Sequence, residues 1–167
     1  MSDFAETKNI KYSIYDIRYT SRIDFPDEEL ARLWNEFNWE KAEQKLFLWQ
    51  QILSKVALKK NKEKIIKLQN RIVSSLEARA LAVKKVSDKP RVGVGIDGVR
   101  WRRPEEKMRA AILLNKKPYK CQPLKQVVIQ DKRGFKERRI GIPTLQDRAM
   151  QILHFFALEP VAEAFRR

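Results

Sequence analysis

The sequence predicts a mostly helical α+β chain in which an N-terminal helical hairpin is followed by a basic β-hairpin. Apolar residues recur at spacings of three and four through residues 46–83, which is the period of amphipathic helices. β-branched runs flank a polar turn within residues 125–142, a pattern typical of a two-stranded hairpin. Hydrophobic residues make up 43% of the 167 residues, so the chain has enough apolar surface to bury a core.

The helical hairpin is expected between Pro26 and residue 86. Its first helix begins after Pro26, and one face of it holds Leu46, Trp49, Leu53 and Val56. After a polar segment at residues 59–64, a second continuous helix carries Ile65, Leu68, Ile72, Leu76, Ala80 and Val83. Because so short a segment joins them, the two helices are expected to pack antiparallel. Residues 48–53 and 67–72 also resemble each other faintly, over too short a stretch to establish a repeat.

A loop and a helix are expected after Pro90, which disfavours helix in the residue before it. Residues 91–98 hold three of the five glycines and indicate a loop. Pro104 marks the start of a helix that ends before Pro118.

The β-hairpin and a last helix complete the expected fold. Strands are expected at residues 125–130 and 136–142, with a turn at residues 131–134. Thr144 is expected to cap the last helix, which Pro160 bends or ends.

The positive charge is concentrated after residue 58. Residues 1–58 carry a net charge of −2 and residues 59–167 carry +17, within a total of +15. This distribution favours a polyanion as partner, because neutralising phosphates releases condensed counterions. Nucleic acid is therefore the leading candidate, and a highly charged soluble surface is the alternative.

Residue content excludes several classes of protein. No apolar run is long enough to span a membrane, and no targeting signal is recognisable. Cys121 is the one cysteine and His154 the one histidine, which excludes an internal disulfide and a Cys/His zinc cluster within this chain. The aspartates lie scattered beside turns and helix starts and form no evident pair for two-metal catalysis. His154 and most of the four tryptophans are expected to be structural.

The basic hairpin is the most informative candidate site. Alternation along its second strand places Arg138 on one face with Ile140 and Ile142, and Arg139 on the other. Further cations in and beside the expected turn are Lys132, Arg133 and Lys136. Arginine binds phosphate oxygens in bidentate fashion, and lysine supplies a mobile point charge. The alternative is an exposed hairpin whose cations serve solubility.

Short motifs occur in a characteristic order along the chain. They are Trp34-Asn35, Asn38-Trp39, Leu68-Gln69-Asn70-Arg71-Ile72, Ala78-Arg79-Ala80-Leu81-Ala82-Val83, Gly95-Ile96-Asp97-Gly98, Arg138 with Gly141-Ile142-Pro143-Thr144, Asp147-Arg148-Ala149-Met150-Gln151 and Leu158-Glu159-Pro160-Val161-Ala162-Glu163. In content and order this set resembles group II intron reverse transcriptases, also called maturases. The resemblance covers about Trp34 to Glu163.

The resemblance implies a division into parts and a set of site residues. The parts are an N-terminal arm at residues 1–26, a helical N-terminal extension at 27–90 and a partial fingers domain at 91–167. The residues that resemble the template-side loop are Gly95, Ile96, Asp97 and Gly98. The cations that resemble those holding the triphosphate of an incoming nucleotide are Lys132, Arg133 and Arg138. The cations expected to contact RNA are Lys59, Lys60, Lys64, Arg71, Arg79, Lys84, Lys85, Arg91, Lys136 and Arg139.

The sequence departs from the family's pattern in three places. Val94 stands where the family usually has proline. One extra residue lies between Gly134 and Arg138, so the choice between Lys132 and Arg133 stays open. The palm with its metal-binding aspartates is not found, so no catalytic or metal-binding residue is predicted, and Mg²⁺ is expected only with a palm domain.

The expected function is therefore RNA binding, as the N-terminal and fingers part of an RNA-directed DNA polymerase and splicing maturase of the group II intron type that does not polymerise alone. Its expected partner is intron or template RNA. The alternatives are one subunit of a split polymerase with a separate palm polypeptide, and a non-catalytic structural RNA-binding protein of a larger ribonucleoprotein. No membrane partner is expected, and the expected compartment is the bacterial cytoplasm or, in a eukaryote, an organellar matrix.

Overall fold

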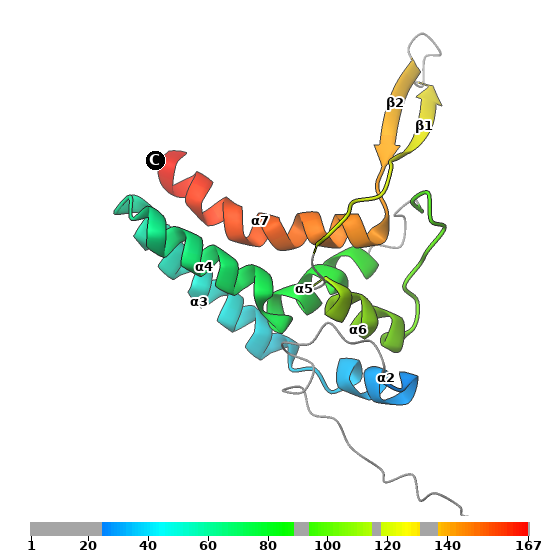
Figure 1. The fold of residues 1–167 in the computed structure, drawn as a ribbon, viewed down its shortest axis with the longest axis horizontal. Coiled ribbons are helices and arrows are strands. Elements are labelled where there is room, and N and C mark those ends of the chain that lie inside the picture. The colour runs from blue at the N-terminus through cyan, green and yellow to red at the C-terminus, as the bar shows by residue number, and fades with distance from the viewer. Residues whose placement is uncertain (1–24, 89–93, 115–117, 131–136, 167) are drawn as a thin grey trace, which may run out of the picture.

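The computed structural model describes residues 25–88, 94–114, 118–130 and 137–166 (Figure 1). Its elements in chain order are α2 (Asp27–Asn35), α3 (Trp39–Leu58), α4 (Lys62–Ser74), α5 (Leu76–Ser87), α6 (Pro104–Leu113), β1 (Lys125–Gln130), β2 (Glu137–Ile142) and α7 (Leu145–Arg166). Figure 1 shows a helical body from which the antiparallel β1–β2 hairpin projects beside the N-terminal end of α7. The predicted class, mostly helical α+β with a small β-hairpin, is confirmed.

Capping residues divide both of the long helices that were expected in the first half. α3 begins after Asn38, whose side chain accepts a hydrogen bond of 2.9 Å from the Lys41 amide. α5 begins after Ser75, whose backbone is extended, with ψ of 139°, and whose hydroxyl accepts a hydrogen bond of 3.2 Å from the Ala78 amide. The expectation of one continuous second helix is therefore wrong, because the serine ends α4 and caps the next helix instead.

The core lies where α3, α4 and α5 pack against α7, and it continues where α6 packs on α2 and α5. α3 and α4 run antiparallel, as their short connection predicts (Figure 1). Large, fully buried side chains at its centre include Leu30, Leu53, Ile72, Met108 and Leu153. Trp34 is buried, and Trp39, Trp49 and Trp101 pack half-buried against the core. The structural role expected for most tryptophans is confirmed.

α7 continues through Pro160 and bends toward its C-terminal end (Figure 1). Proline has no amide hydrogen, so the carbonyl of Phe156, four residues earlier, loses its usual donor within the helix. The side-chain amide of Gln50 on α3 donates to this carbonyl at 2.9 Å. A contact between two helices therefore satisfies an acceptor that the proline would otherwise leave without a donor.

A second glutamine makes a matching contact one residue further along α7. The side-chain amide of Gln69 on α4 donates to the carbonyl of Ala157 at 3.1 Å. Gln50 and Gln69 occupy corresponding positions in the two similar segments 48–53 and 67–72. The faint similarity between those segments thus coincides with a shared mode of attachment to the bend of α7.

Gln50→Ala is expected to lower the free energy of unfolding by about 1–3 kcal/mol, because it leaves the Phe156 carbonyl without its donor. The loss should be smaller in a Pro160→Ala background, where residue 160 supplies an amide hydrogen. Chemical unfolding of the wild type, the two single variants and the double variant measures this difference. The matched control is Gln51→Ala at an exposed neighbouring position, expected to change the free energy by less than about 0.5 kcal/mol. Equal losses in both backgrounds would contradict the role given to Gln50.

Candidate nucleic-acid interface

The β1–β2 hairpin places its two described arginines on opposite faces. Residues paired across an antiparallel hairpin point to the same side, and the register pairs Arg138 with Ile129. Arg138 shares this face with Ile140 and Ile142, as predicted, whereas Arg139 lies on the other face. Arg138 is thus a cation at the end of an apolar strip.

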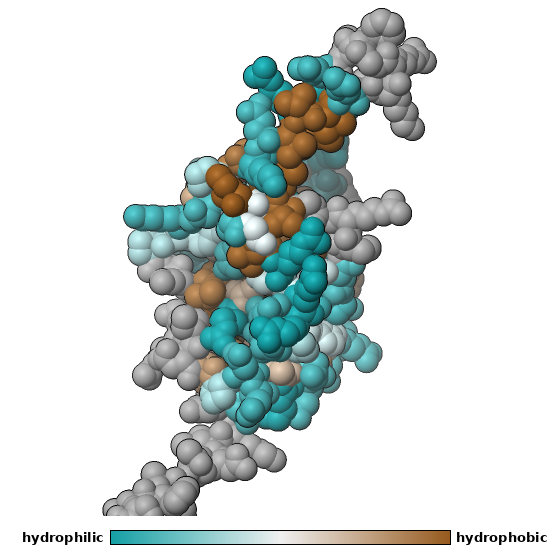
Figure 2. Space-filling view, turned by 90° about the vertical axis from the view of Figure 1, so that its right-hand side faces the viewer, coloured by the Kyte–Doolittle hydropathy of each residue, from teal (hydrophilic) through white to brown (hydrophobic). Residues whose placement is uncertain are grey.

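The hairpin stands clear of the helical body (Figure 1). Ile129 is 49% exposed and Ile140 is 41% exposed, and Figure 2 shows hydrophobic side chains along the hairpin bordered by hydrophilic ones. Among the isoleucines of β2, only Ile142, next to the body, is half-buried. Arg138 is therefore held in place by the pairing of β2 with β1 and not by packing of its strand on the core.

The base of the hairpin is fastened to α7 by the carboxylate of Asp147, which is 6% exposed. Ahead of β1, the Tyr119 hydroxyl donates to this carboxylate at 2.8 Å, and the backbone amide of Gln122 donates to it at 3.1 Å. Behind β2, the Thr144 hydroxyl donates to it at 2.7 Å and accepts from the Asp147 amide at 3.1 Å. The predicted cap at Thr144 is confirmed, and the same carboxylate holds the chain on both sides of the hairpin.

The glycine loop, residues 95–98, packs against the base of the hairpin at Thr144. A Cβ atom at residue 95 would lie 2.5 Å from the Thr144 Cα, so Gly95 allows the loop to approach the hairpin base. Gly98 has a φ of +70°, a conformation that favours glycine, and its amide donates to the Gly95 carbonyl at 3.3 Å. Ile96 and Asp97 lie exposed within this turn. The loop that resembles the template-side loop therefore presents two side chains beside the N-terminus of α7.

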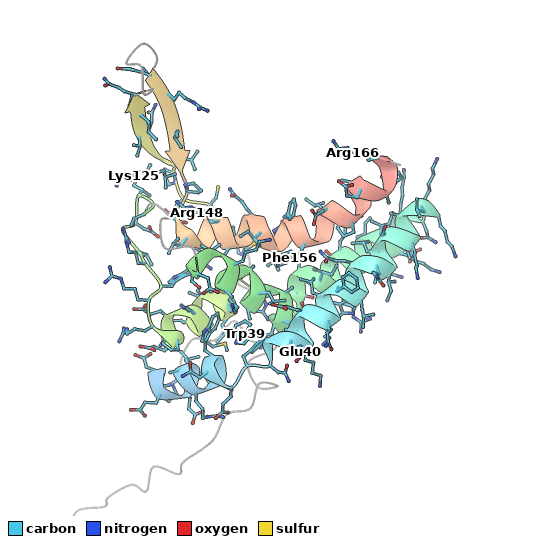
Figure 3. The ribbon with its side chains drawn as sticks, turned by 180° about the vertical axis from the view of Figure 1, so that it is seen from behind. Trp39, Glu40, Lys125, Arg148, Phe156 and Arg166 are labelled. Carbon is cyan, nitrogen blue, oxygen red and sulfur yellow. The ribbon has the colours of Figure 1, made fainter. Side chains whose placement is uncertain are left out.

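A second basic surface lies at the connection between α3 and α4. We call this connection the α3–α4 tip, with the exposed lysines Lys59, Lys60, Lys62 and Lys64. None of these lysines forms an ion pair with another residue in the described ranges. Figure 3 shows Arg166 at this end of the molecule and Lys125 at the other end, at the base of the hairpin. The two basic surfaces thus lie at opposite ends of α7.

The predicted cations of α4 and α5 have different surroundings. Arg71 is exposed, with its guanidinium carbon 5.6 Å from the centre of the Trp49 ring. Lys84 forms an ion pair of 2.7 Å with Asp88, which neutralises its charge within the chain. Lys85 is exposed. Arg71 and Lys85 therefore present charge to solvent more directly than Lys84 does.

Arg79 is not a surface residue, which corrects its expected place among the RNA-binding cations. Its side chain is 0% exposed, and its guanidinium donates to the carbonyls of Ala111 at 3.0 Å, Ile112 at 3.3 Å and Ser75 at 3.3 Å. Burial lowers the pKa of this guanidinium to about 10, so it stays protonated at neutral pH. The cation sits at the C-terminal end of α6, where carbonyl groups lack helical donors and favour positive charge.

Four other predicted site residues lie outside the described residues, namely Arg91, Lys132, Arg133 and Lys136. Their assignments as RNA-binding or triphosphate-binding cations stay predictions.

Two comparisons with known proteins found similar sequences. The family described as the N-terminal domain of reverse transcriptase matches residues 34–114. The chain is also 34% identical over 139 residues to "Maturase-like protein 1" of Euglena gracilis, in an alignment that covers 79% of this chain. The chain belongs to the reverse transcriptase and maturase family. It spans about 30% of the length of that relative.

The matched reverse transcriptase domain begins in α2 and ends just after α6. It therefore runs across residue 90, where the sequence places the boundary between extension and fingers. The hydrogen bonds from Arg79 on α5 to the end of α6 also cross this point. The division of the chain at residue 90 stays a prediction.

Sequence analysis missed two exposed cations of these basic surfaces. Lys62 belongs to the α3–α4 tip, and the run of lysines at residues 59–64 was the signal that pointed to it. Lys125 pairs with Ile142 and so lies on the same hairpin face as Arg138. Alternation along residues 125–130 was the signal for Lys125.

The described part of the chain gathers no three His, Cys, Asp or Glu side chains that could hold a metal ion. We therefore assign no Mg²⁺ site to these residues. No helix within the described residues has the length and hydropathy needed to span a membrane.

Tyr119→Phe is expected to lower the free energy of unfolding by about 1 kcal/mol at neutral pH, because Asp147 loses a hydrogen-bond donor. Burial, and then the hydrogen bond and charge of Asp147, raise the pKa of Tyr119 above its usual value. Its stabilising contribution is therefore full below about pH 10 and is lost as the pH rises through the raised pKa. Chemical unfolding should show the difference between wild type and variant shrinking above about pH 10. A difference that stays constant there would contradict this role of Tyr119.

Proposed function

We propose that this chain is the RNA-binding N-terminal and fingers part of a group II intron-type reverse transcriptase, or maturase. The observation that carries the proposal is the placement of exposed cations at the two ends of α7. The α3–α4 tip lies at one end and the β1–β2 hairpin at the other (Figure 3). Intron or template RNA is the proposed partner.

The α3–α4 tip suits contact with the RNA backbone. Its four lysines are exposed, and no carboxylate in the described ranges neutralises them. They can therefore neutralise phosphates without first breaking an ion pair, which is the source of sequence-independent affinity. Exposed Arg71 on α4 adds a guanidinium to the same helical hairpin. Lys84 is paired with Asp88, so it is proposed to contribute less to RNA binding than these cations do.

The hairpin suits a ligand that combines phosphate with an apolar surface. Arg138 can hold phosphate oxygens in bidentate fashion, while Ile129 and Ile140 on the same face can contact a base or sugar. Under the family resemblance, Lys132 or Arg133 joins Arg138 in holding a nucleotide triphosphate, and residues 95–98 contact the template. Arg139, on the opposite face, is proposed to contact RNA phosphate.

Nucleotide addition and intron splicing are proposals for a whole protein of this family. The matched reverse transcriptase domain and the maturase-like relative support them. The chain corresponds to about 30% of that relative, so the test of function begins with RNA binding by the chain itself.

Replacing the three predicted tip lysines, Lys59, Lys60 and Lys64, with glutamine should weaken RNA binding and its salt dependence together. For single-stranded RNA, each lost phosphate contact makes the negative slope of log K against log salt shallower by about 0.7. The slope of the triple variant should therefore be shallower than that of the wild type by about 2. Filter binding over a series of salt concentrations measures both the affinity and its salt dependence. Lys67→Gln is the control, because Lys67 pairs with Glu63 on its own helix. Wild-type binding that is indifferent to salt would contradict the proposal.

Arg138→Ala should leave the fold intact, since an exposed cation contributes little to stability. It should weaken binding of RNA or nucleoside triphosphate by about 1.5–3 kcal/mol. Arg138→Lys should recover part of this loss, because a point charge does not reproduce the guanidinium fork. Arg139→Ala, on the opposite face, should affect RNA but not triphosphate binding. Circular dichroism controls for folding, and unchanged affinities would indicate a hairpin whose cations serve solubility.

A further inference from the structure

A pocket of about 340 Å³ opens between α3, α5 and α7, away from both basic ends. Its buried apolar wall includes Leu46, Leu81 and Phe156, each at least nine-tenths buried. Figure 3 shows Phe156 on the middle of α7, between the two ends that carry the exposed cations. The pocket therefore lies partway along α7, between the end near the α3–α4 tip and the end near the hairpin (Figure 3).

The pocket has an aromatic side chain available for stacking. Phe47 on α3 lines it and is 58% exposed, so its ring is accessible to a ligand. Single-stranded RNA presents flat bases that stack on such rings, with a gain that does not depend on base identity. The volume falls within the range of pockets that hold small ligands and leaves room for one base.

The polar groups beside Phe47 select one kind of base edge. Glu43 and Gln50 lie within one or two turns of Phe47 on the same face of α3, and both line the pocket. The amide group of Gln50 already donates to the Phe156 carbonyl, so its oxygen is the part that can receive a donor. The Glu43 carboxylate accepts only, and no ion pair to it is found within the described residues. Lys84 and Asp88 also line the pocket, but they form an ion pair of 2.7 Å with each other. The Glu43 carboxylate and the Gln50 oxygen are therefore the acceptors that can bind a base edge rich in donors.

Guanine is the base with such an edge, because its N1–H and N2 amino group are adjacent donors that a carboxylate accepts together. Lys85 lines the same pocket, with its ammonium nitrogen 5.7 Å from the centre of the Phe156 ring. It can meet the guanine O6 or the phosphate of the same nucleotide. We infer that this pocket binds an unpaired guanine base of single-stranded RNA. The inference rests on the proposed RNA-binding function and adds a base-specific contact to it.

The test compares short RNAs of about 10 nucleotides, all uridine except for one central position. That position holds guanosine, inosine or uridine, and affinity for the full chain is measured by fluorescence anisotropy. The wild type should bind the guanosine RNA at least about fivefold more tightly than the uridine RNA. Inosine lacks the N2 amino group and should lose most of this preference.

Two pocket variants and one matched control test whether the preference for guanosine arises in this pocket. Phe47→Ala should abolish the guanosine preference, and Glu43→Gln should remove the difference between guanosine and inosine. Phe165→Ala removes an aromatic ring of equal exposure, 58%, outside the pocket lining, and it should keep the wild-type preference. Circular dichroism and chemical unfolding confirm that each variant is folded.

The outcomes separate this inference from the proposed function. Equal binding of all three RNAs, or a guanosine preference that survives in Phe47→Ala and Glu43→Gln, would overturn the pocket and leave RNA binding in place. Failure to bind any of the RNAs would overturn both. If Phe47→Ala instead changes the self-association of the free chain in sedimentation experiments and keeps the guanosine preference, the pocket holds a protein side chain, which also overturns the inference.

Discussion

The buried carboxylate of Asp147 joins the β1–β2 hairpin to the last helix. It stands in the first turn of α7, where free amide groups favour negative charge. From there it receives donors from both sides of the hairpin, at Tyr119, Gln122 and Thr144. Because Gly95 packs against Thr144 at the same point, the glycine loop, the hairpin and the last helix all take their positions from one capped helix end.

From this capped end, α7 runs across the molecule. Its 22 residues correspond to about 30 Å of helix, and helices α3, α4 and α5 pack along it. Pro160 bends it, and Gln50 and Gln69 fasten the bend to α3 and α4. The hairpin and the α3–α4 tip are therefore held apart by a supported helix. The pocket at Phe156 lies between them along α7 (Figure 3).

Much of this architecture is predictable because its signals are local. The period of apolar residues predicts the helices, and alternation in residues 125–142 predicts the hairpin and the shared face of Arg138 and Ile140. Ser75 was missed as a boundary because apolar spacing continues on both sides of it, and the choice between helix and cap depends on a hydrogen bond of its hydroxyl. The ordered motifs pointed to the reverse transcriptase and maturase family without any of these details.

The sequence by itself determined the fold class, the uneven positive charge, the cap at Thr144 and the family. Only the tertiary structure decided which cations face solvent and which groups of the core converge. In the sequence Arg79 looks like any helical cation. In the structure its guanidinium donates hydrogen bonds to the carbonyls of Ala111 and Ile112, more than thirty residues away, inside the core. The pocket likewise exists only where three helices meet. Burial and long-range hydrogen bonds depend on groups that packing brings together, and no local pattern of residues records that proximity.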